Sequence, residues 1–308
     1  MQNTLKKSFS LSGKGLHSGK FVNVNILPAS ADYGIWFKRV DLKNEDPLIP
    51  ALFDMVSETK LCTKISNSEG ASVQTIEHLM AAFAGTGIHN ALVEIDGPEL
   101  PILDGSAMVY VKEILNIGLV SQKLPIRGYK VLKEVSVIDG KSWASLKPSS
   151  ELSINFEIDY SDTFLGWQSL ELNMKNGCFV RELCDSRTFC RSSEIPLMRK
   201  KGLALGGSLE NAIVIENDHI LNKEGLRYND ECVRHKMLDA MGDLSLLGGP
   251  LIGSFSASCG GHALTNKLLH KTFEDISALK PILIKEKDAI NLPGFGICES
   301  DINRLNKS

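Results

Sequence analysis

The sequence predicts an α+β fold built from two similar domains, and two observations support this. Runs in which apolar and polar residues alternate gather early in each half of the chain, and helical patterns follow them. That order is typical of mainly antiparallel sheets with helices on one face. In addition, residues 78–95 and 235–255 each hold a histidine near a helix start, a glycine seven residues later and then an apolar strand. Chance similarity between two helix–glycine–strand patterns is the alternative to a duplicated unit.

The elements of the first half follow from turn, cap and periodicity signals. They are, in order, a hairpin turn at 17–20 followed by a strand at 22–28, a polar insert with short strands at 57–73, a helix at 75–85 and an apolar strand at 91–95. The helix has apolar residues at i, i+3, i+4 and i+7, which predicts one buried face. Thr75 is its expected N-cap, and Gly85 is its expected C-terminal stop.

The second half repeats this order. Its elements are a hairpin turn at 138–141 followed by a strand at 143–148, a glycine-rich insert with a helix and strands at 181–217, a helix at 234–244, a strand at 251–255 and a helix that opens at His262. We therefore place the join near residues 123–127, which divides the chain into domains at 1–125 and 126–300. Residues 301–308 form a polar tail that is expected to fray.

Composition predicts a globular protein. The 308 residues leave room for two cores, with 43% hydrophobic and 23% charged residues. The formal charge of −3 gives no footprint of a nucleic-acid-binding protein. The N-terminus does not resemble a signal peptide, and no apolar run approaches the ~20 residues of a membrane span, so a cytoplasmic location is expected. The seven cysteines are odd in number and lack a Cys-x-x-Cys pair, so any metal must use histidine and carboxylate ligands.

The strongest chemical pattern lies in residues 234–243. In a helix, His235, Asp239 and Asp243 fall at i, i+4 and i+8 and form one polar stripe opposite an apolar face. Imidazole with carboxylate is ligand chemistry for zinc or a similar divalent ion, and the i, i+4 spacing lets two side chains reach one ion. A solvated surface pair is the commoner origin of such spacing.

A second candidate segment opens the helix at 75–85. Glu77 and His78 lie off its apolar face, beside the small side chains of Ala81 and Ala82, which leave room for a ligand or a partner helix. Glu77 is also in the first turn, where the helix dipole favours an anion. For this segment alone, a capping glutamate and a hydrogen-bonded histidine are the simpler interpretation.

Other polar positions are less specific. Thr188 by itself is more typical of a structural hydroxyl, and residues 202–208 lack the spacings of a dinucleotide or phosphate loop. His262 follows two glycines that permit close approach of a ligand, although a hydrogen-bonded histidine at a helix start is an equal alternative. The carboxylates of residues 96–105 accompany turn signals. Four histidines have no partner that the sequence identifies: His17, His89, His219 and His270.

Together these segments resemble the zinc-dependent UDP-3-O-acyl-N-acetylglucosamine deacetylases, which catalyse the committed step of lipid A synthesis in Gram-negative bacteria. The resemblance follows the family's order and spacing over residues 13–20, 75–107, 186–189, 202–217, 226–249 and 261–269. It implies two domains, each a sheet layered with two helices. The helices would lie between the two sheets, and each domain would carry one insert.

The same resemblance implies a role for each candidate residue. The metal ligands for Zn²⁺ would be His78, His235 and Asp239, with a fourth position for water. The general base would be Glu77, the general acid His262 held by Asp243, and Thr188 would help to stabilise the oxyanion. Substrate contacts would come from Lys236 at the diphosphate, Tyr160 stacked on uracil, and an acyl-chain tunnel in the second insert with Phe189 and Ser208.

Departures from the family pattern are few. Gly260 replaces a more usual residue before Gly261, and Ser142 stands where many members have a lysine facing the nucleotide. The resemblance implies a monomeric enzyme for a small-molecule substrate, an acylated UDP-amino sugar, with no nucleic acid and no transmembrane segment. Two alternatives remain open: a zinc amidohydrolase for another N-acetyl sugar nucleotide, and a non-catalytic homologue. The second is disfavoured because every catalytic position is filled.

Overall fold

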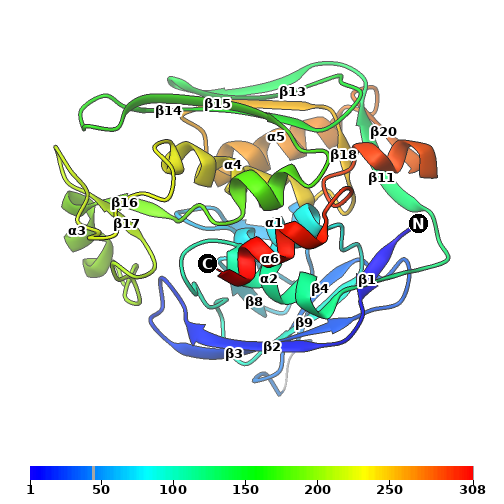
Figure 1. The fold of residues 1–308 in the computed structure, drawn as a ribbon, viewed down its shortest axis with the longest axis horizontal. Helices are drawn as coiled ribbons and strands as arrows, with labels where there is room; N and C mark the ends of the chain where they lie inside the picture. The colour runs from blue at the N-terminus through cyan, green and yellow to red at the C-terminus, as the bar shows by residue number, and fades with distance from the viewer. Residues whose placement is uncertain (44–45, 308) are drawn as a thin grey trace.

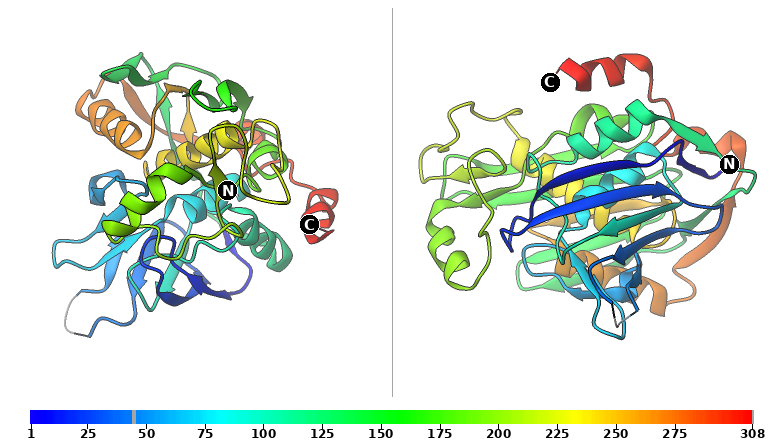
Figure 2. Two further views of the ribbon diagram at one scale, coloured as in Figure 1. Left: turned by 90° about the vertical axis from the view of Figure 1, so that its left-hand side faces the viewer. Right: turned by 90° about the horizontal axis from the view of Figure 1, so that it is seen from below.

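Two five-stranded sheets enclose a layer of helices in the computed structural model, which describes residues 1–43 and 46–307. Figure 1 shows one sheet above, the other below and the main helices between them. These helices are α1 (Glu77–Thr86), α2 (Met108–Ile117), α4 (Glu231–Ser245) and α5 (His262–Glu274). The right-hand view of Figure 2 shows the strands of the first sheet lying across this helical layer. The predicted α+β fold, with its helices sandwiched between two sheets, is therefore confirmed.

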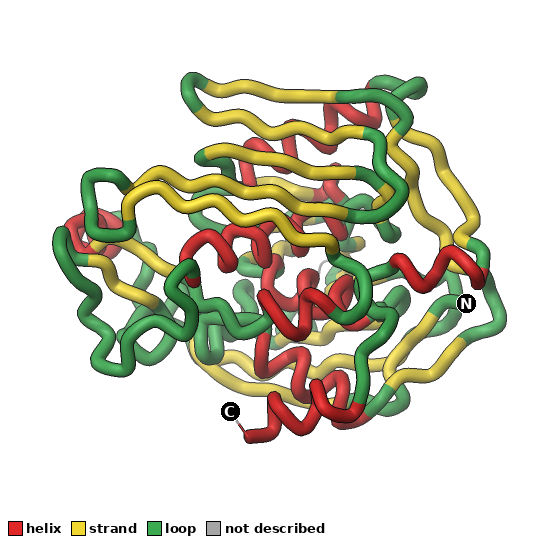
Figure 3. Tube along the Cα trace, turned by 45° about the horizontal axis from the view of Figure 1, so that its top comes forward, coloured by secondary structure: helices red, strands yellow, loops and turns green. Residues whose placement is uncertain are grey.

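The two sheets have the same topology. The strand order is β2-β3-β9-β4-β5 in the first sheet and β12-β13-β19-β14-β15 in the second. In the first sheet β4 pairs with β9 in parallel, and in the second sheet the equivalent strands β14 and β19 do the same. All other neighbouring strands in the two sheets pair antiparallel. The bounds are β2 (Phe9–Lys14), β3 (Phe21–Pro28), β4 (Ile35–Arg39), β5 (Leu48–Pro50), β9 (Ala91–Ile95), β12 (Val135–Asp139), β13 (Ser142–Lys147), β14 (Ser153–Tyr160), β15 (Gly166–Asn173) and β19 (Ser254–Ser258). This shared topology, visible as two yellow layers in Figure 3, confirms the duplication.

Helix α1 is buried on nearly every side because both domains pack around it. Its ends differ from the sequence prediction. Thr75 is not the N-cap: its backbone has a φ of +59°, and its hydroxyl donates instead to buried Glu99 at 3.0 Å. Gly85 is not the stop but lies inside the helix, and Gly87, with a φ of +78°, takes the left-handed C-cap position. Tertiary partners therefore outweighed local cap preferences at both ends.

The two glycines paired by the internal repeat permit close packing of α1. A Cβ at Gly242 in α4 would collide with the carbonyl oxygen of Glu77, and a Cβ at Gly85 would collide with the ring of Phe179. Only a residue without a side chain lets backbone approach so closely. Gly242 therefore sets the separation of α1 and α4 at the level of Glu77.

Replacing Gly242 with alanine should destabilise the protein, because the added methyl group meets backbone that cannot rotate away. Overpacking of this kind lowers the free energy of unfolding by roughly 1–3 kcal/mol. Urea unfolding of Gly242→Ala beside Gly207→Ala would measure the effect, since a Cβ at Gly207 meets its nearest atom at an ordinary 3.4 Å. Equal midpoints for the two variants would contradict the proposed close approach of the helices.

Both predicted inserts contain the expected short strands. In the first they are β6 (Val56–Glu58), β7 (Lys64–Ser66) and β8 (Ser72–Gln74), and the second holds β16 (Phe189–Arg191), α3 (Ile195–Lys200) and β17 (Ile213–Ile215). The second insert, at the left of Figure 1, also contacts the first domain. The amides of Leu205 and Gly206 donate to the carbonyls of His17 and Leu16 at 3.1 and 3.0 Å.

The apolar run at 251–255 is not one strand, as predicted, but two. Gly253 separates β18 (Leu251–Ile252), which pairs with β11 (Ile126–Val131), from β19 in the second sheet. The other elements are β1 (Asn3–Leu5), β10 (Leu119–Ser121), β20 (Leu279–Ile284), three short 3-10 helices, η1 (Phe53–Met55), η3 (Ser192–Glu194) and η4 (Glu286–Asn291), and one π-helical segment, η2 (Phe179–Leu183). Among the described residues, no helix has both the length and the apolar character needed to cross a bilayer.

The C-terminal segment is also not the frayed tail that was predicted. Residues Glu299–Lys307 form α6, which packs against α2. Asp301 is buried and accepts two hydrogen bonds from Arg181, at 2.7 and 2.8 Å, and Leu305 is 1% exposed. A polar sequence is ordered here because Leu305 is buried and the carboxylate of Asp301 binds an arginine 120 positions away in the chain.

The ion pair of α6 should make its docking sensitive to acid. The guanidinium of Arg181 holds the pKa of Asp301 at about 2, below its ordinary value of 3.8. The pair therefore contributes full stability above pH ~4 and loses it as the pH falls toward 2. Asp301→Asn should lower the free energy of unfolding by about 1 kcal/mol at pH 7, and the difference from the wild type should shrink as the pH falls through 2 and vanish below it. Thermal unfolding from pH 7 to below pH 2 would test this, and a difference that does not shrink as the pH falls through 2 would contradict it.

Candidate metal centre

Three side chains with metal-ligating atoms converge where α1 meets α4. His78, His235 and Asp239 each offer one ligand atom, and these atoms lie within 4.8 Å of one another. Nε2 of His235 lies 3.3 Å from Oδ1 of Asp239, and Nε2 of His78 lies 3.7 Å from the same oxygen. The two imidazole rings are nearly perpendicular, with centroids 5.0 Å apart. The first domain contributes one ligand and the second contributes two.

Local sequence accounts for this geometry. The i, i+4 spacing puts His235 and Asp239 on one face of α4, and that face meets the first turn of α1, which carries His78. All three side chains are buried, with exposed fractions of 2%, 5% and 5% for His235, Asp239 and His78. Buried histidine and carboxylate in this arrangement fit a metal centre better than the solvated pair that the sequence left open.

The electrostatics favour the protonation states that ligands need. Burial lowers the pKa of His78 to about 3 and also lowers the pKa of His235, so both imidazoles are neutral at pH 7. Burial alone would raise the pKa of Asp239, but its neighbours His235 and Lys236 outweigh burial and hold that pKa far below its ordinary value. Two neutral imidazoles and one carboxylate are the donor set of an open zinc site.

A second buried group adjoins these ligands. Nδ1 of His262 lies 2.8 Å from Oδ2 of Asp243, and Nε2 of the same ring lies 3.9 Å from Oε1 of Glu77. Burial alone lowers the pKa of His262, but the carboxylates of Asp243 and Glu77 outweigh it and raise that pKa to about 9. Burial raises the pKa of Glu77 to about 7. A buried carboxylate and a buried imidazole, both able to exchange protons, thus lie beside the candidate metal ligands.

Thr63, which the sequence did not single out, donates hydrogen bonds to the carboxylates of both Asp243 and Glu77. It lies in the first insert and is 2% exposed. Its hydroxyl donates to Oδ1 of Asp243 at 2.6 Å, and its backbone amide donates to Oε2 of Glu77 at 3.0 Å. No local pattern marks such a residue, because its hydroxyl partner is 180 positions away in the chain.

The predicted substrate residues divide into two groups. Lys236, Phe189 and Tyr160 lie close to the centre. Nζ of Lys236 donates to Oδ2 of Asp239 at 2.8 Å, and the ring of Phe189 lies 6.2 Å from that of His235 and 5.6 Å from that of Tyr160. These contacts place an aromatic surface beside the metal ligands.

Ser208, the fourth predicted substrate residue, and Thr188, the predicted oxyanion donor, are held by hydrogen bonds with the backbone. Thr188 is half-buried just before β16, where its amide donates to the carbonyl of Gly105 at 2.8 Å. Ser208 lies on an exposed turn, and its hydroxyl accepts from the amide of Glu210 at 3.3 Å. These contacts tie Ser208 to its own turn rather than to the metal ligands.

His17 is a buried histidine to which the sequence gave no partner. Its exposed fraction is 3%, and its Nδ1 accepts from the amide of Ala204, in the second insert, at 3.4 Å. Burial lowers its pKa, Glu99 raises it and His262 lowers it further, so the ring lies within electrostatic reach of the catalytic candidates. Glu99 fixes this turn by accepting the amides of His17 and Ser18, both at 2.7 Å.

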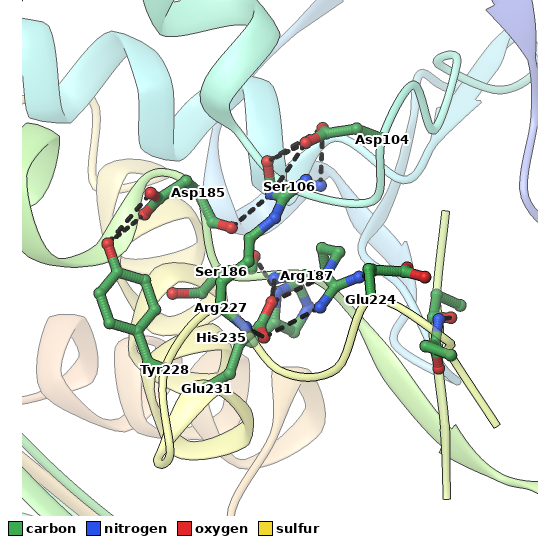
Figure 4. Close-up of polar contacts among 12 residues, drawn as sticks. Asp104, Ser106, Asp185, Ser186, Arg187, Glu224, Arg227, Tyr228, Glu231 and His235 are labelled. Carbon is green, nitrogen blue, oxygen red and sulfur yellow. Dashed lines mark hydrogen bonds and ion pairs between the residues drawn. The ribbon is translucent and has the colours of Figure 1, made fainter. Parts of the chain in front are cut away.

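Figure 4 shows the residues that orient the ring of His235 on its Nδ1 side. Its Nδ1 lies 3.0 Å from the carbonyl oxygen of Ser186, an acceptor only, so Nδ1 carries the proton and Nε2 is left free to ligate. The neighbouring Arg187 is paired with Glu231, the first residue of α4. The ring orientation is therefore set by the loop that precedes β16.

Comparison with known proteins identifies the family. The family model described as UDP-3-O-acyl N-acetylglycosamine deacetylase matches residues 2–274. Relatives named UDP-3-O-acyl-N-acetylglucosamine deacetylase include those of Phenylobacterium zucineum, 45% identical over 87% of this chain and 92% of the relative, and Actinobacillus succinogenes, 42% identical over 94% and 95%. A third, from Syntrophus aciditrophicus, is 42% identical over 89% and 86%. This chain belongs to the UDP-3-O-acyl-N-acetylglucosamine deacetylase family.

Proposed function

We propose that this protein hydrolyses the N-acetyl group of UDP-3-O-(3-hydroxyacyl)-N-acetylglucosamine. The products would be acetate and the free 2-amine, and the reaction would be the committed step of lipid A biosynthesis. One observation carries the proposal beyond family membership. The ligand atoms of His78, His235 and Asp239 converge within 4.8 Å, and the buried side chains of Glu77 and His262 lie beside them, with Nε2 of His262 4.0 Å from Oδ2 of Asp239.

We assign His78, His235 and Asp239 as the ligands of Zn²⁺, because two neutral imidazoles and a carboxylate are a donor set that zinc prefers. When bound there, zinc polarises a carbonyl group and makes water a stronger acid. The hydrogen bond from Nδ1 of His235 to the Ser186 carbonyl, at 3.0 Å, supports the assignment. Such a contact orients a ligating imidazole and increases its basicity.

The remaining catalytic work falls to the side chains around this centre. Glu77 would accept the proton of the attacking water, and the amide of Thr63 holds its carboxylate in place for this. Thr188 would donate a hydrogen bond to the tetrahedral oxyanion. His262, kept protonated by Asp243, would then give its Nε2 proton to the departing sugar nitrogen.

Binding would come from groups further along the substrate. Lys236 would face the diphosphate, Tyr160 would stack on the uracil, and the second insert, near Thr188 to Ser208, would form the tunnel that holds the acyl chain. Each methylene of that chain contributes ~0.8 kcal/mol when it is buried. A long 3-hydroxyacyl group therefore anchors the sugar while the acetamide lies at the metal ligands.

Mass spectrometry of acetate release from the acylated UDP-sugar, with and without a chelator, tests this function. Release that stops when the metal is removed and resumes when zinc is restored is the expected result. A parallel assay with the sugar nucleotide that lacks the 3-O-acyl group addresses the alternative of a broader amidohydrolase. No release from either substrate would identify a non-catalytic homologue.

The cellular setting is part of the same proposal. All seven cysteines are free thiols, which suits a reducing compartment, so we place the enzyme in the cytoplasm. We also propose that it acts as a monomer and that the boundary between its two domains in the chain falls near residue 125, between β10 and β11.

A further inference from the structure

A buried ion pair between Arg187 and Glu231 lies near the proposed ligand His235 (Figure 4) and has no part in the proposed reaction. Arg187 and Glu231 are 3% and 0% exposed at their side chains. Nε and Nη2 of Arg187 donate to the two carboxylate oxygens of Glu231 at 2.9 and 3.2 Å. This two-point contact fixes the relative orientation of both groups as well as their distance.

The Glu231 carboxylate also holds backbone. It accepts the amide of Arg187 itself at 3.0 Å and the amide of Arg227 at 2.6 Å. Nη2 of Arg187 donates further to the carbonyl of Gly225 at 2.8 Å. One buried carboxylate at the start of α4 therefore fastens two loops, residues 185–188 and 224–228, to the helix.

The residues on either side of Arg187 carry the proposed chemistry. The carbonyl of Ser186 accepts the hydrogen bond of His235, and Thr188 is the candidate oxyanion donor. His235 stands four residues after Glu231 on the same helix, one turn further on. The loop is thus attached to α4 at two successive turns, once by the ion pair and once by the histidine.

We propose that Glu231 and Arg187 are positioning residues that set the ring of His235 and the hydroxyl of Thr188. This inference rests on the proposed function of His235 as a metal ligand. A contribution to stability alone does not explain the pair, because a buried ion pair adds little net stability over apolar side chains of similar size. By contrast, mutation of the groups that orient a ligating histidine typically lowers metal affinity or activity 10- to 100-fold.

Zinc affinity of metal-free protein, measured by competition with a chromophoric chelator, tests the inference together with kcat and KM. Glu231→Gln replaces one carboxylate oxygen with an NH2 group, which faces N–H donors and cannot accept their hydrogen bonds. Arg187→Lys retains the charge but loses the two-point contact. Both should weaken zinc binding roughly 10- to 100-fold and lower kcat, with KM within about twofold of the wild type. Glu224→Gln is the matched control, because Glu224 contacts the same guanidinium at 2.9 Å from a side chain that is 57% exposed. It should leave all three quantities within about twofold.

Thermal unfolding establishes that each variant is folded. A variant that leaves one charge buried and unpaired is strongly destabilised, whereas the double variant Arg187→Met, Glu231→Met removes both charges and the anchor together. Zinc affinity and kcat within about twofold of the wild type in a folded variant would overturn the inference. A wild-type protein that fails to bind zinc would instead refute the proposed metal centre, so the two failures are distinguishable.

Discussion

Replacement of His78 with alanine should release the metal and abolish deacetylation. Only two protein ligands, both on α4, would remain, and an open zinc site needs three. Zinc content should fall from about one ion per chain to less than about a tenth after dialysis. Elemental analysis of the dialysed protein, beside the acetate assay, would measure both losses.

His270→Ala is the control for that experiment, because His270 is exposed on α5. It should retain both zinc and activity. The cavity left by the smaller side chain in α1 also lowers stability, so circular dichroism must show that His78→Ala is folded. A folded His78→Ala protein that keeps its zinc would remove His78 from the ligand set.

Glu77→Gln should have the opposite signature, with zinc retained and turnover lost. The amide has the size of the carboxylate and can still accept the hydrogen bond from the Thr63 amide, but it cannot take a proton from water. Loss of a general base lowers kcat by roughly 10²- to 10⁴-fold. Glu77→Ala should lose turnover too, without loss of metal.

Glu134→Gln, at a side chain that is 55% exposed, is the matched control for the same chemical change. Metal content, kcat and KM of the two variants should be determined on the same preparations. Full activity in Glu77→Gln or Glu77→Ala would show that another group takes the proton. Loss of zinc in either would mean that the carboxylate supports the ligands directly.

Local geometry explains which parts of the site the sequence revealed. His235 and Asp239 lie one helical turn apart, so their common face follows from spacing alone. The apolar periodicity of 75–85 in the same way placed Glu77 and His78 off the apolar face of their helix, although the structure buries that side as well, against the second domain. Which two helices meet is a tertiary fact, and here the internal repeat and the family resemblance provided it. The identical topology of the two sheets shows why the repeat was informative.

The parts that the sequence did not reveal all depend on partners distant in the chain. Thr63 was missed because Asp243, which accepts the hydrogen bond from its hydroxyl, is 180 residues away. The prediction of Thr75 as an N-cap was wrong because its hydroxyl donates a hydrogen bond to Glu99 instead. The prediction of a frayed C-terminal tail was wrong because Asp301 is paired with Arg181. Propensities describe what a segment does in isolation, and in each case a tertiary contact outweighed them.

The candidate ligands are divided between the two halves of the molecule, one from α1 and two from α4. Neither half supplies all three, so a cation held there would also link the two halves. Its binding free energy then adds directly to the docking of one sheet-and-helix layer on the other. For this enzyme, metal affinity and the stability of the contact between the two halves would be thermodynamically coupled.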